Sequence, residues 1–128
     1  MRIVLASHNT LSQAMLEAAE MFLGKQENVG VVGLFPGDSP ADFEDNFREI
    51  AESSDPEEEC LILCDILSGT PFNIASKISY HNEKIRVLYG MNLPIVVEAL
   101  SSRDTMNLKE LCKELLSTGQ QSYGIGKY

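Results

Sequence analysis

Short apolar runs alternate along the chain with longer stretches of helical periodicity. Near-continuous apolar runs are typical of strands that are buried on both faces of a sheet. Because helical stretches separate the runs, the pattern predicts right-handed crossovers and a mostly parallel sheet with helices on both faces. Four such runs occur: RIVLAS at residues 2–7, NVGVVGLF at 28–35, CLILCD at 60–65 and KIRVLYG at 84–90.

Capping residues predict where the first helix begins and ends. Thr10 and Gln13 have the spacing of a capping box, and Gly24 is a natural stop. The apolar positions between them recur at intervals of four, three and four, which is typical of one buried helix face. That predicted face consists of Leu11, Met15, Ala18 and Phe22.

Similar signals mark the later helices. Ser39 is expected to cap a helix that begins at Pro40, and Thr70 a helix that begins at Pro71. The last helix is expected to stop at Gly119. The acidic run at 53–59 predicts a solvated loop, and the tail at 120–128 a short edge strand. The predicted inward residues are Phe43, Phe47 and Ile50; Phe72, Ala75 and Ile78; and Leu108, Leu111, Cys112 and Leu115.

Length and composition narrow the classes of protein. A chain of 128 residues is expected to form one domain over residues 1–128. It carries no apolar run of membrane-spanning length and no secretion signal, so we expect a cytoplasmic protein. Three cysteines without CxxC spacing argue against a disulfide framework or a zinc site. The net charge of −9 argues against binding to nucleic acid or to an anionic membrane.

Polar residues follow the predicted strands at the sheet edge where ligands bind in open α/β folds. His8 follows the first strand, Asp65 the third and Asn92 the fourth. In a flavodoxin-like strand order, here 2-1-3-4, the first and third strands are neighbours, so His8 is expected to face Asp65. A carboxylate that accepts a hydrogen bond from one imidazole nitrogen leaves the other nitrogen unprotonated and nucleophilic.

The segment Ser68–Thr70 suits an incoming phosphoryl group. Gly69 and Thr70 place backbone N–H groups at a predicted helix start, where unpaired amides and the helix dipole attract anions. The helix that begins near Thr10 offers the same beside His8. Each feature alone also fits an ordinary loop, turn or cap. Their joint placement at strand ends is what favours a phosphate site.

The motifs at these residues resemble the enzyme IIA component of the mannose-type sugar phosphotransferase system. That family has a strand running into SH, a D-[LIV]-x-G-G-[ST]-P-x-N segment after the third strand and G-x-N-L-P after the fourth. The similarity spans most of the chain, with the motifs in order. The counterparts here are ASHNTLSQAM (6–15), PGDSPADF (36–43), CDILSGTPFNIAS (64–76) and GMNLPIVVEAL (90–100).

The resemblance implies a phosphocarrier that needs no metal or cofactor. His8 would accept a phosphoryl group from the phosphohistidine of HPr and pass it to a IIB component, which serves the membrane permease IIC/IID. Asp65 would orient His8, and Thr70 would contact the phosphate. The family fold adds an antiparallel edge strand that is exchanged in a homodimer, and SYGIGK at 122–127 could supply it.

Two residues depart from the family pattern, since Asn9 and Ser68 replace common glycines. If these positions need a positive φ, Asn tolerates it fairly well and Ser less so. Neither change removes a reacting group. Residues near the site are candidates for docking HPr and IIB, although the apolar ones equally fit the core: Leu67, Phe72, Met91, Asn92 and Leu93.

Three rival functions stay open at this point. The first is a non-enzymatic, flavodoxin-like module that binds a phosphorylated metabolite, for which His8 would be dispensable. The second is the phosphoryl-donor subunit of dihydroxyacetone kinase. The SGTPFN and GMNLP segments favour the sugar-transport family over this subunit. The third is a hydrolase that uses Ser7 or Ser68 with His8, which is disfavoured because neither serine lies in a GxSxG elbow.

Overall fold

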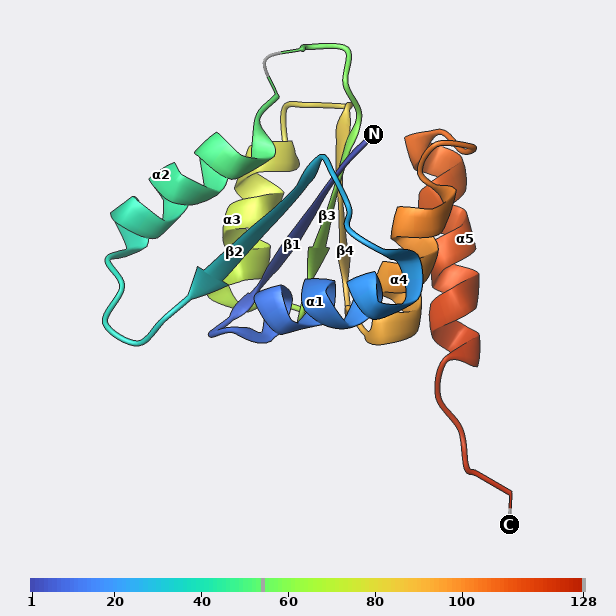
Figure 1. Cartoon of the computed structure of the whole chain (residues 1–128). Coiled ribbons are helices and arrows are strands. Elements are labelled where there is room, and N and C mark those ends of the chain that lie inside the picture. Colours follow the sequence, from blue (N-terminus) through green and yellow to red (C-terminus); the bar gives the residue numbers. More distant parts are fainter. Residues whose placement is uncertain (54, 128) are drawn as a thin grey trace.

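Four parallel strands form the centre of the computed structural model, which describes residues 1–53 and 55–127 (Figure 1). Their order is β2-β1-β3-β4, which confirms the predicted α/β class and strand order. Residue 54 of the predicted acidic loop and residue 128 of the predicted tail strand lie outside the described residues. In chain order the elements are β1 (Arg2–His8), α1 (Leu11–Leu23), β2 (Val29–Leu34), α2 (Pro40–Ala51), β3 (Cys60–Cys64), α3 (Thr70–Ser79), β4 (Ile85–Tyr89), α4 (Leu93–Ser102) and α5 (Leu108–Gln121).

Strand register brings the polar strand ends together. Strand β1 pairs with β3 up to Ala6, which lies opposite Cys64. On its other side β1 pairs with β2 as far as His8, opposite Leu34. His8 and Asp65 therefore leave the sheet at the same edge, from neighbouring strands.

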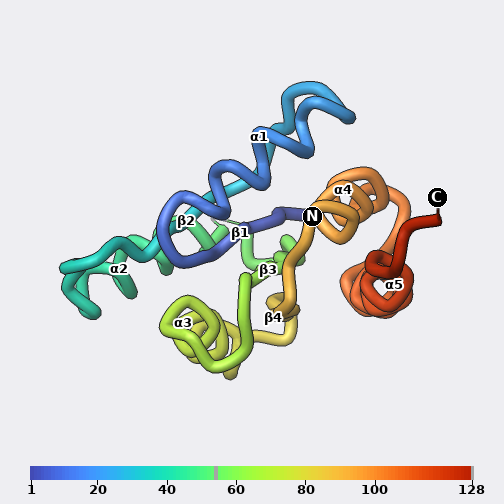
Figure 2. Tube along the Cα trace, turned by 90° about the horizontal axis from the view of Figure 1, so that it is seen from below, coloured from blue at the N-terminus to red at the C-terminus, as the bar shows by residue number. Residues whose placement is uncertain are grey.

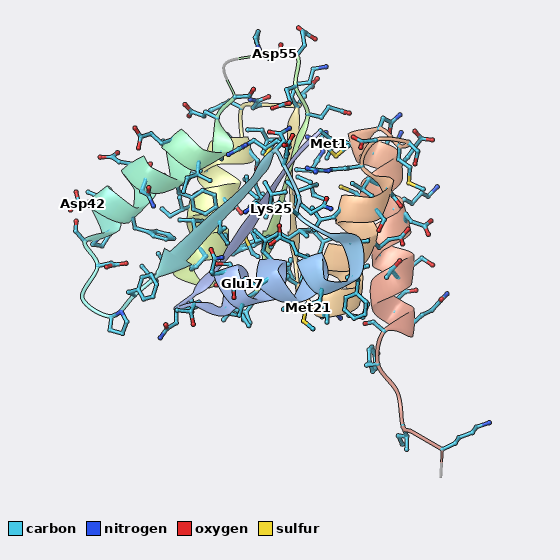
Figure 3. The ribbon with its side chains drawn as sticks, in the orientation of Figure 1. Met1, Glu17, Met21, Lys25, Asp42 and Asp55 are labelled. Atoms are coloured by element: carbon cyan, nitrogen blue, oxygen red, sulfur yellow. The ribbon has the colours of Figure 1, made fainter. Side chains whose placement is uncertain are left out.

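Helices cover both faces of the sheet, and each face has its own apolar core. Helices α1, α4 and α5 lie on one side and α2 and α3 on the other (Figure 2). Residues of β1 alternate between the two cores: Leu5 packs toward α1 and α4, whereas Val4 packs toward α2 and α3. The acidic side chains of Asp42 and Asp55 point outward into solvent (Figure 3).

The predicted inward face of α1 is only partly correct. Met15 packs against the core and Ala18 is partly buried, but Leu11 is exposed and Phe22 is 70% exposed. The buried residues of the helix are instead Ser12, Leu16 and Ala19. The predicted capping box is also absent, because Thr10 makes no side-chain cap bond and the Gln13 amide donates to Glu17 instead. Helix α1 therefore has two neighbouring apolar stripes, and the sheet covers the one that contains a serine.

Other helices follow the predictions more closely. Ser39 caps α2 by accepting from the N–H of Asp42, with Pro40 at the start of the helix as expected. In α3 the cap is Gly69 rather than Thr70, which is already helical. The predicted inward residues Ile50, Phe72 and Cys112 are only partly buried.

The end of α5 differs from the prediction. The helix continues through Gly119 to Gln121. A Cβ at position 119 would lie 3.2 Å from Cδ1 of Ile95 in α4, which is a tight contact. This glycine allows close packing rather than ending the helix. Beyond it, residues 123–127 form no strand in the described part of the chain and extend away from the sheet (Figure 1). Across residues 1–53 and 55–127, no helix is both long and apolar enough to cross a membrane.

Candidate active site

His8 and Asp65 contact each other directly at the carboxyl edge of the sheet. The Nδ1 atom of His8 lies 2.8 Å from Oδ2 of Asp65, and the backbone N–H of His8 donates to the same oxygen at 2.9 Å. The His8 side chain is 45% exposed, whereas that of Asp65 is 8% exposed. A sheltered carboxylate thus holds an accessible imidazole at two points.

This geometry assigns the two ring nitrogens. An ionised carboxylate can only accept hydrogen bonds, so Nδ1 of His8 carries the proton and donates it to Asp65. In the neutral ring Nε2 is then unprotonated and has a free lone pair. The accessible ring therefore presents an unprotonated nitrogen, and His8 faces Asp65 as sequence analysis expected.

The environment of Asp65 keeps its carboxyl group ionised. Burial alone would raise the pKa of Asp65. Hydrogen bonds from the backbone and ring of His8 and from the Ile66 N–H lower it, and together they outweigh the effect of burial. The net result is a pKa of Asp65 below its ordinary value. Asp65 is therefore available to stabilise positive charge on the His8 ring.

The β3–α3 segment lies against the edge of the ring that carries Nε2. A Cβ placed on Gly69 would lie 2.8 Å from Cε1 of His8 and 3.4 Å from Nε2. Gly69 also precedes Thr70, the first residue of α3, so the helix N-terminus begins beside the imidazole. The backbone N–H groups of this first turn and the positive helix end suit an anion bound near Nε2.

Both residues that replace family glycines have a positive φ. Asn9 has φ +54° and Ser68 has φ +65°. Asn9 stabilises its turn with its own side chain, since Oδ1 accepts from the Thr10 N–H at 2.9 Å. Ser68 is the more strained of the two, because serine adopts this region less readily than asparagine.

The predicted docking residues occupy different environments. Leu67 is exposed, and Phe72 is partly buried and packs edge-to-face on the exposed Tyr89. Met91 is 7% exposed and belongs to the core, against which Leu93 also packs. Asn92 caps α4 by accepting from Ile95 and donates to Ser122 at 2.8 Å.

Sequence analysis missed three further apolar side chains that are exposed at or beside this edge. They are Leu11 at the start of α1, Phe35 after β2 and Ile66 after β3. Their signal in the sequence was position alone, since each lies within three residues of a strand end or helix start. Together with Leu67 they give the site an apolar surround.

Ser7, one of the two serines considered for a hydrolase, is fully buried. Its hydroxyl accepts a hydrogen bond from the Ser12 N–H at 2.7 Å. A nucleophile must reach its substrate, so Ser7 does not fit the role of a hydrolase serine. Sequence analysis gave Ser7 no structural role, although a polar residue at the end of the run RIVLAS was a visible signal.

Comparison with known proteins gives consistent matches along the chain. The profile of the EIIA-man family, described as "PTS system fructose IIA component", matches residues 2–116. The fructose-specific EIIA component of Bacillus subtilis is 29% identical over 123 residues, covering 96% of this chain and 84% of the relative. The sorbose-specific EIIA component of Klebsiella pneumoniae is 30% identical over 118 residues, covering 92% and 86%.

Other relatives agree in sequence or in fold. The mannose-specific EIIAB component of Escherichia coli is 34% identical over 120 residues, and the match covers 93% of this chain but only 37% of that longer protein. Among solved structures, EIIA from Streptococcus agalactiae superimposes with a TM-score of 0.86 at 28% identity, covering 97% of this chain and 95% of that one.

Proposed function

Because the chain belongs to the EIIA-man family and is thus a phosphocarrier component of the sugar phosphotransferase system, we propose that His8 is its phosphoryl acceptor. In this proposal HPr donates the group, His8 carries it as a phosphohistidine, and a IIB component receives it. The observation that carries the proposal is the hydrogen bond from Nδ1 of His8 to Asp65, which leaves Nε2 free.

Transfer consists of one bond exchange. The Nε2 lone pair of His8 attacks the phosphorus of phospho-HPr, the phosphorus–nitrogen bond to HPr breaks, and the HPr ring nitrogen recovers its electron pair. The proton on Nδ1 of His8 stays in place, so the ring becomes cationic and Asp65 stabilises it. Transfer to IIB repeats these steps with His8 as donor.

The surrounding residues act by position and charge. Phosphoryl transfer has a loose transition state, so alignment and electrostatic stabilisation account for most of the catalysis. We assign the backbone amides of Ser68, Gly69 and Thr70, together with the Thr70 hydroxyl, to the phosphoryl oxygens. Their placement at the start of α3 beside His8 supports this assignment.

The docking surface for HPr and IIB is proposed to be the apolar surround of His8. Its members are Leu11, Phe35, Ile66 and Leu67, which are all exposed. The Phe72–Tyr89 pair extends this surface toward β4. Burial of Met91 and partial burial of Leu93 indicate that these two support the surface from within, as Asn92 does by capping α4.

We further propose that residues 1–128 form a single IIA domain of a cytoplasmic homodimer, serving a IIC/IID permease through IIB. The support for exchange of the tail is its exposure: Tyr123 and Ile125 are 84% and 95% exposed among the residues that the structure describes. Within residues 1–53 and 55–127, the edge strands β2 and β4 each pair on one side only, so a partner's tail could pair on the other.

The test is intact-mass analysis after incubation with phosphoenolpyruvate, enzyme I and HPr. We expect an acid-labile gain of one phosphoryl group that is absent in His8→Ala. The variant should keep its fold, because the His8 side chain lies largely outside the core. A wild-type chain that gains nothing from active HPr would contradict the proposal and favour the phosphometabolite-binding module or the kinase-linked donor.

A further inference from the structure

Two serines beneath His8 form a buried polar chain that phosphoryl chemistry does not use. Ser7 is 0% exposed and Ser12 is 1% exposed, and among the described residues they are the polar residues that are buried as a whole. The Ser7 hydroxyl accepts from the Ser12 N–H at 2.7 Å, and the Ser12 hydroxyl donates to the Val32 carbonyl at 3.0 Å. The chain therefore connects β1, α1 and β2.

This connection closes the turn on which His8 stands. Residues 9 and 10 join β1 to α1 directly after His8, and the Ser7–Ser12 bond spans this turn from one end to the other. Within the turn, the Asn9 N–H donates to the Leu34 carbonyl at 2.7 Å. Because Asn9 has φ +54°, the turn has a backbone conformation that non-glycine residues seldom adopt unless other contacts hold it.

The His8 side chain is 45% exposed, so its position depends on the backbone that carries it. On the β3 side the ring is held by the bond to Asp65 and lies against Gly69. On the side of α1 and β2, the two serines hold the backbone next to His8. With Ser7 removed as acceptor, the Ser12 N–H would lose its partner in a site that water does not reach.

We propose that Ser7 and Ser12 are positioning residues for phosphoryl transfer, which fix the backbone of His8 so that Nε2 points at the incoming phosphorus. This inference rests on the proposed phosphocarrier function. Misplacement of a reacting group by about 1 Å can cost about a hundredfold in rate. We therefore expect Ser7→Ala to slow transfer by about 10- to 100-fold.

The experiment measures the rate of phosphoryl transfer from phospho-HPr as a function of HPr concentration, in wild type, Ser7→Ala, Ser7→Thr and Ser12→Ala. The matched control is Asn107→Ala, which removes a helix-capping side chain at the opposite end of the strands. Thermal unfolding reports the stability of each variant, and ¹⁵N spectra of the His8 ring report its hydrogen bond to Asp65.

We expect Ser7→Ala to lower the maximal rate, to leave KM within about twofold and to shift the ¹⁵N resonances of His8. Ser7→Thr, which keeps the hydroxyl, should restore the rate, and Ser12→Ala should show a smaller loss. Wild-type kinetics in Ser7→Ala, or an equal loss in Asn107→Ala, would overturn the inference. If the wild type gains no phosphoryl group, the proposed function fails instead, and the His8 spectrum of Ser7→Ala still decides whether the serines position the ring.

Discussion

Gly69→Ala tests whether the phosphoryl acceptor needs the space beside it. Gly69 has φ −86° and ψ 168°, an extended conformation open to any residue, so alanine introduces no backbone strain. Its Cβ would lie 2.8 Å from Cε1 of His8. To reach an ordinary contact of 3.4 Å, the ring or the loop must move by about 0.6 Å.

The expected cost falls on catalysis more than on folding. Ring movement strains the 2.8 Å bond to Asp65, and the new methyl group lies against the Cε1–Nε2 edge where phosphorus must approach. A misplacement of about 1 Å can cost about a hundredfold in rate, so a movement of about 0.6 Å predicts a loss of about tenfold in transfer rate, or about 1.4 kcal/mol in the barrier. The free energy of unfolding should change by only about 1 kcal/mol, because alanine also restricts the unfolded chain.

The assay is rapid-quench transfer from phospho-HPr, with Asn107→Ala as the control because Asn107 caps α5 at the end of the strands opposite His8. Asn107→Ala should transfer at the wild-type rate. Wild-type transfer in Gly69→Ala would refute the reasoning, since it would show that the ring tolerates a methyl group at its nucleophilic edge. So would an unfolding free energy lowered by several kcal/mol, which would place the effect in the fold.

Three further changes probe the site and the tail. Ser68→Gly should raise the free energy of unfolding by about 0.5–1 kcal/mol in urea titration, because it relieves a serine held at φ +65°; no gain would mean that the loop is unstrained. Asp65→Asn should slow transfer and should weaken the fall in unfolding free energy at acid pH. The pKa of Asp65 is lowered from its ordinary value of 3.8 in the folded chain, so the ionised carboxylate stabilises the fold above pH 3.8. That stabilisation is lost as the pH falls through the lowered pKa. An unchanged acid limb would count against the His8–Asp65 bond. The intact chain should have the mass of a dimer in light scattering, and deleting the residues after Ser122 should reduce it to that of a monomer; a truncated chain that stays dimeric would mean that another surface joins the two chains, and an intact chain that is monomeric would contradict the proposed homodimer.

The strands and the His8–Asp65 pair were predictable because simple rules govern them. A strand buried on both faces must be apolar throughout, and neighbouring parallel strands end at one edge of the sheet. The inward face of α1 was not predictable in this way. Its sequence has two apolar stripes, and the stripe that packs on the sheet includes Ser12, whose hydrogen bonds become visible only when Val32 and Ser7 are in place.

Helix ends show the same division between local and tertiary causes. Ser39 caps α2 with a local bond, and its residue type sufficed to predict it. The start of α1 is capped by Ser7, five residues upstream of its partner, so the local Thr10 pattern was misleading. Gly119 looked like a helix stop, but its role depends on how closely α4 approaches α5.

The bond between Asn92 and Ser122 has a consequence for chain connectivity. Asn92 follows the carboxyl end of β4, so the hydrogen bond fixes the exit of the tail at the same end of the sheet as His8. A phosphoryl-accepting domain fused there through a flexible linker would start on the side of the molecule where the imidazole is exposed. A short flexible linker gives an effective concentration of about millimolar between the two linked domains. The rate at which His8 meets its acceptor would then be independent of the protein concentration.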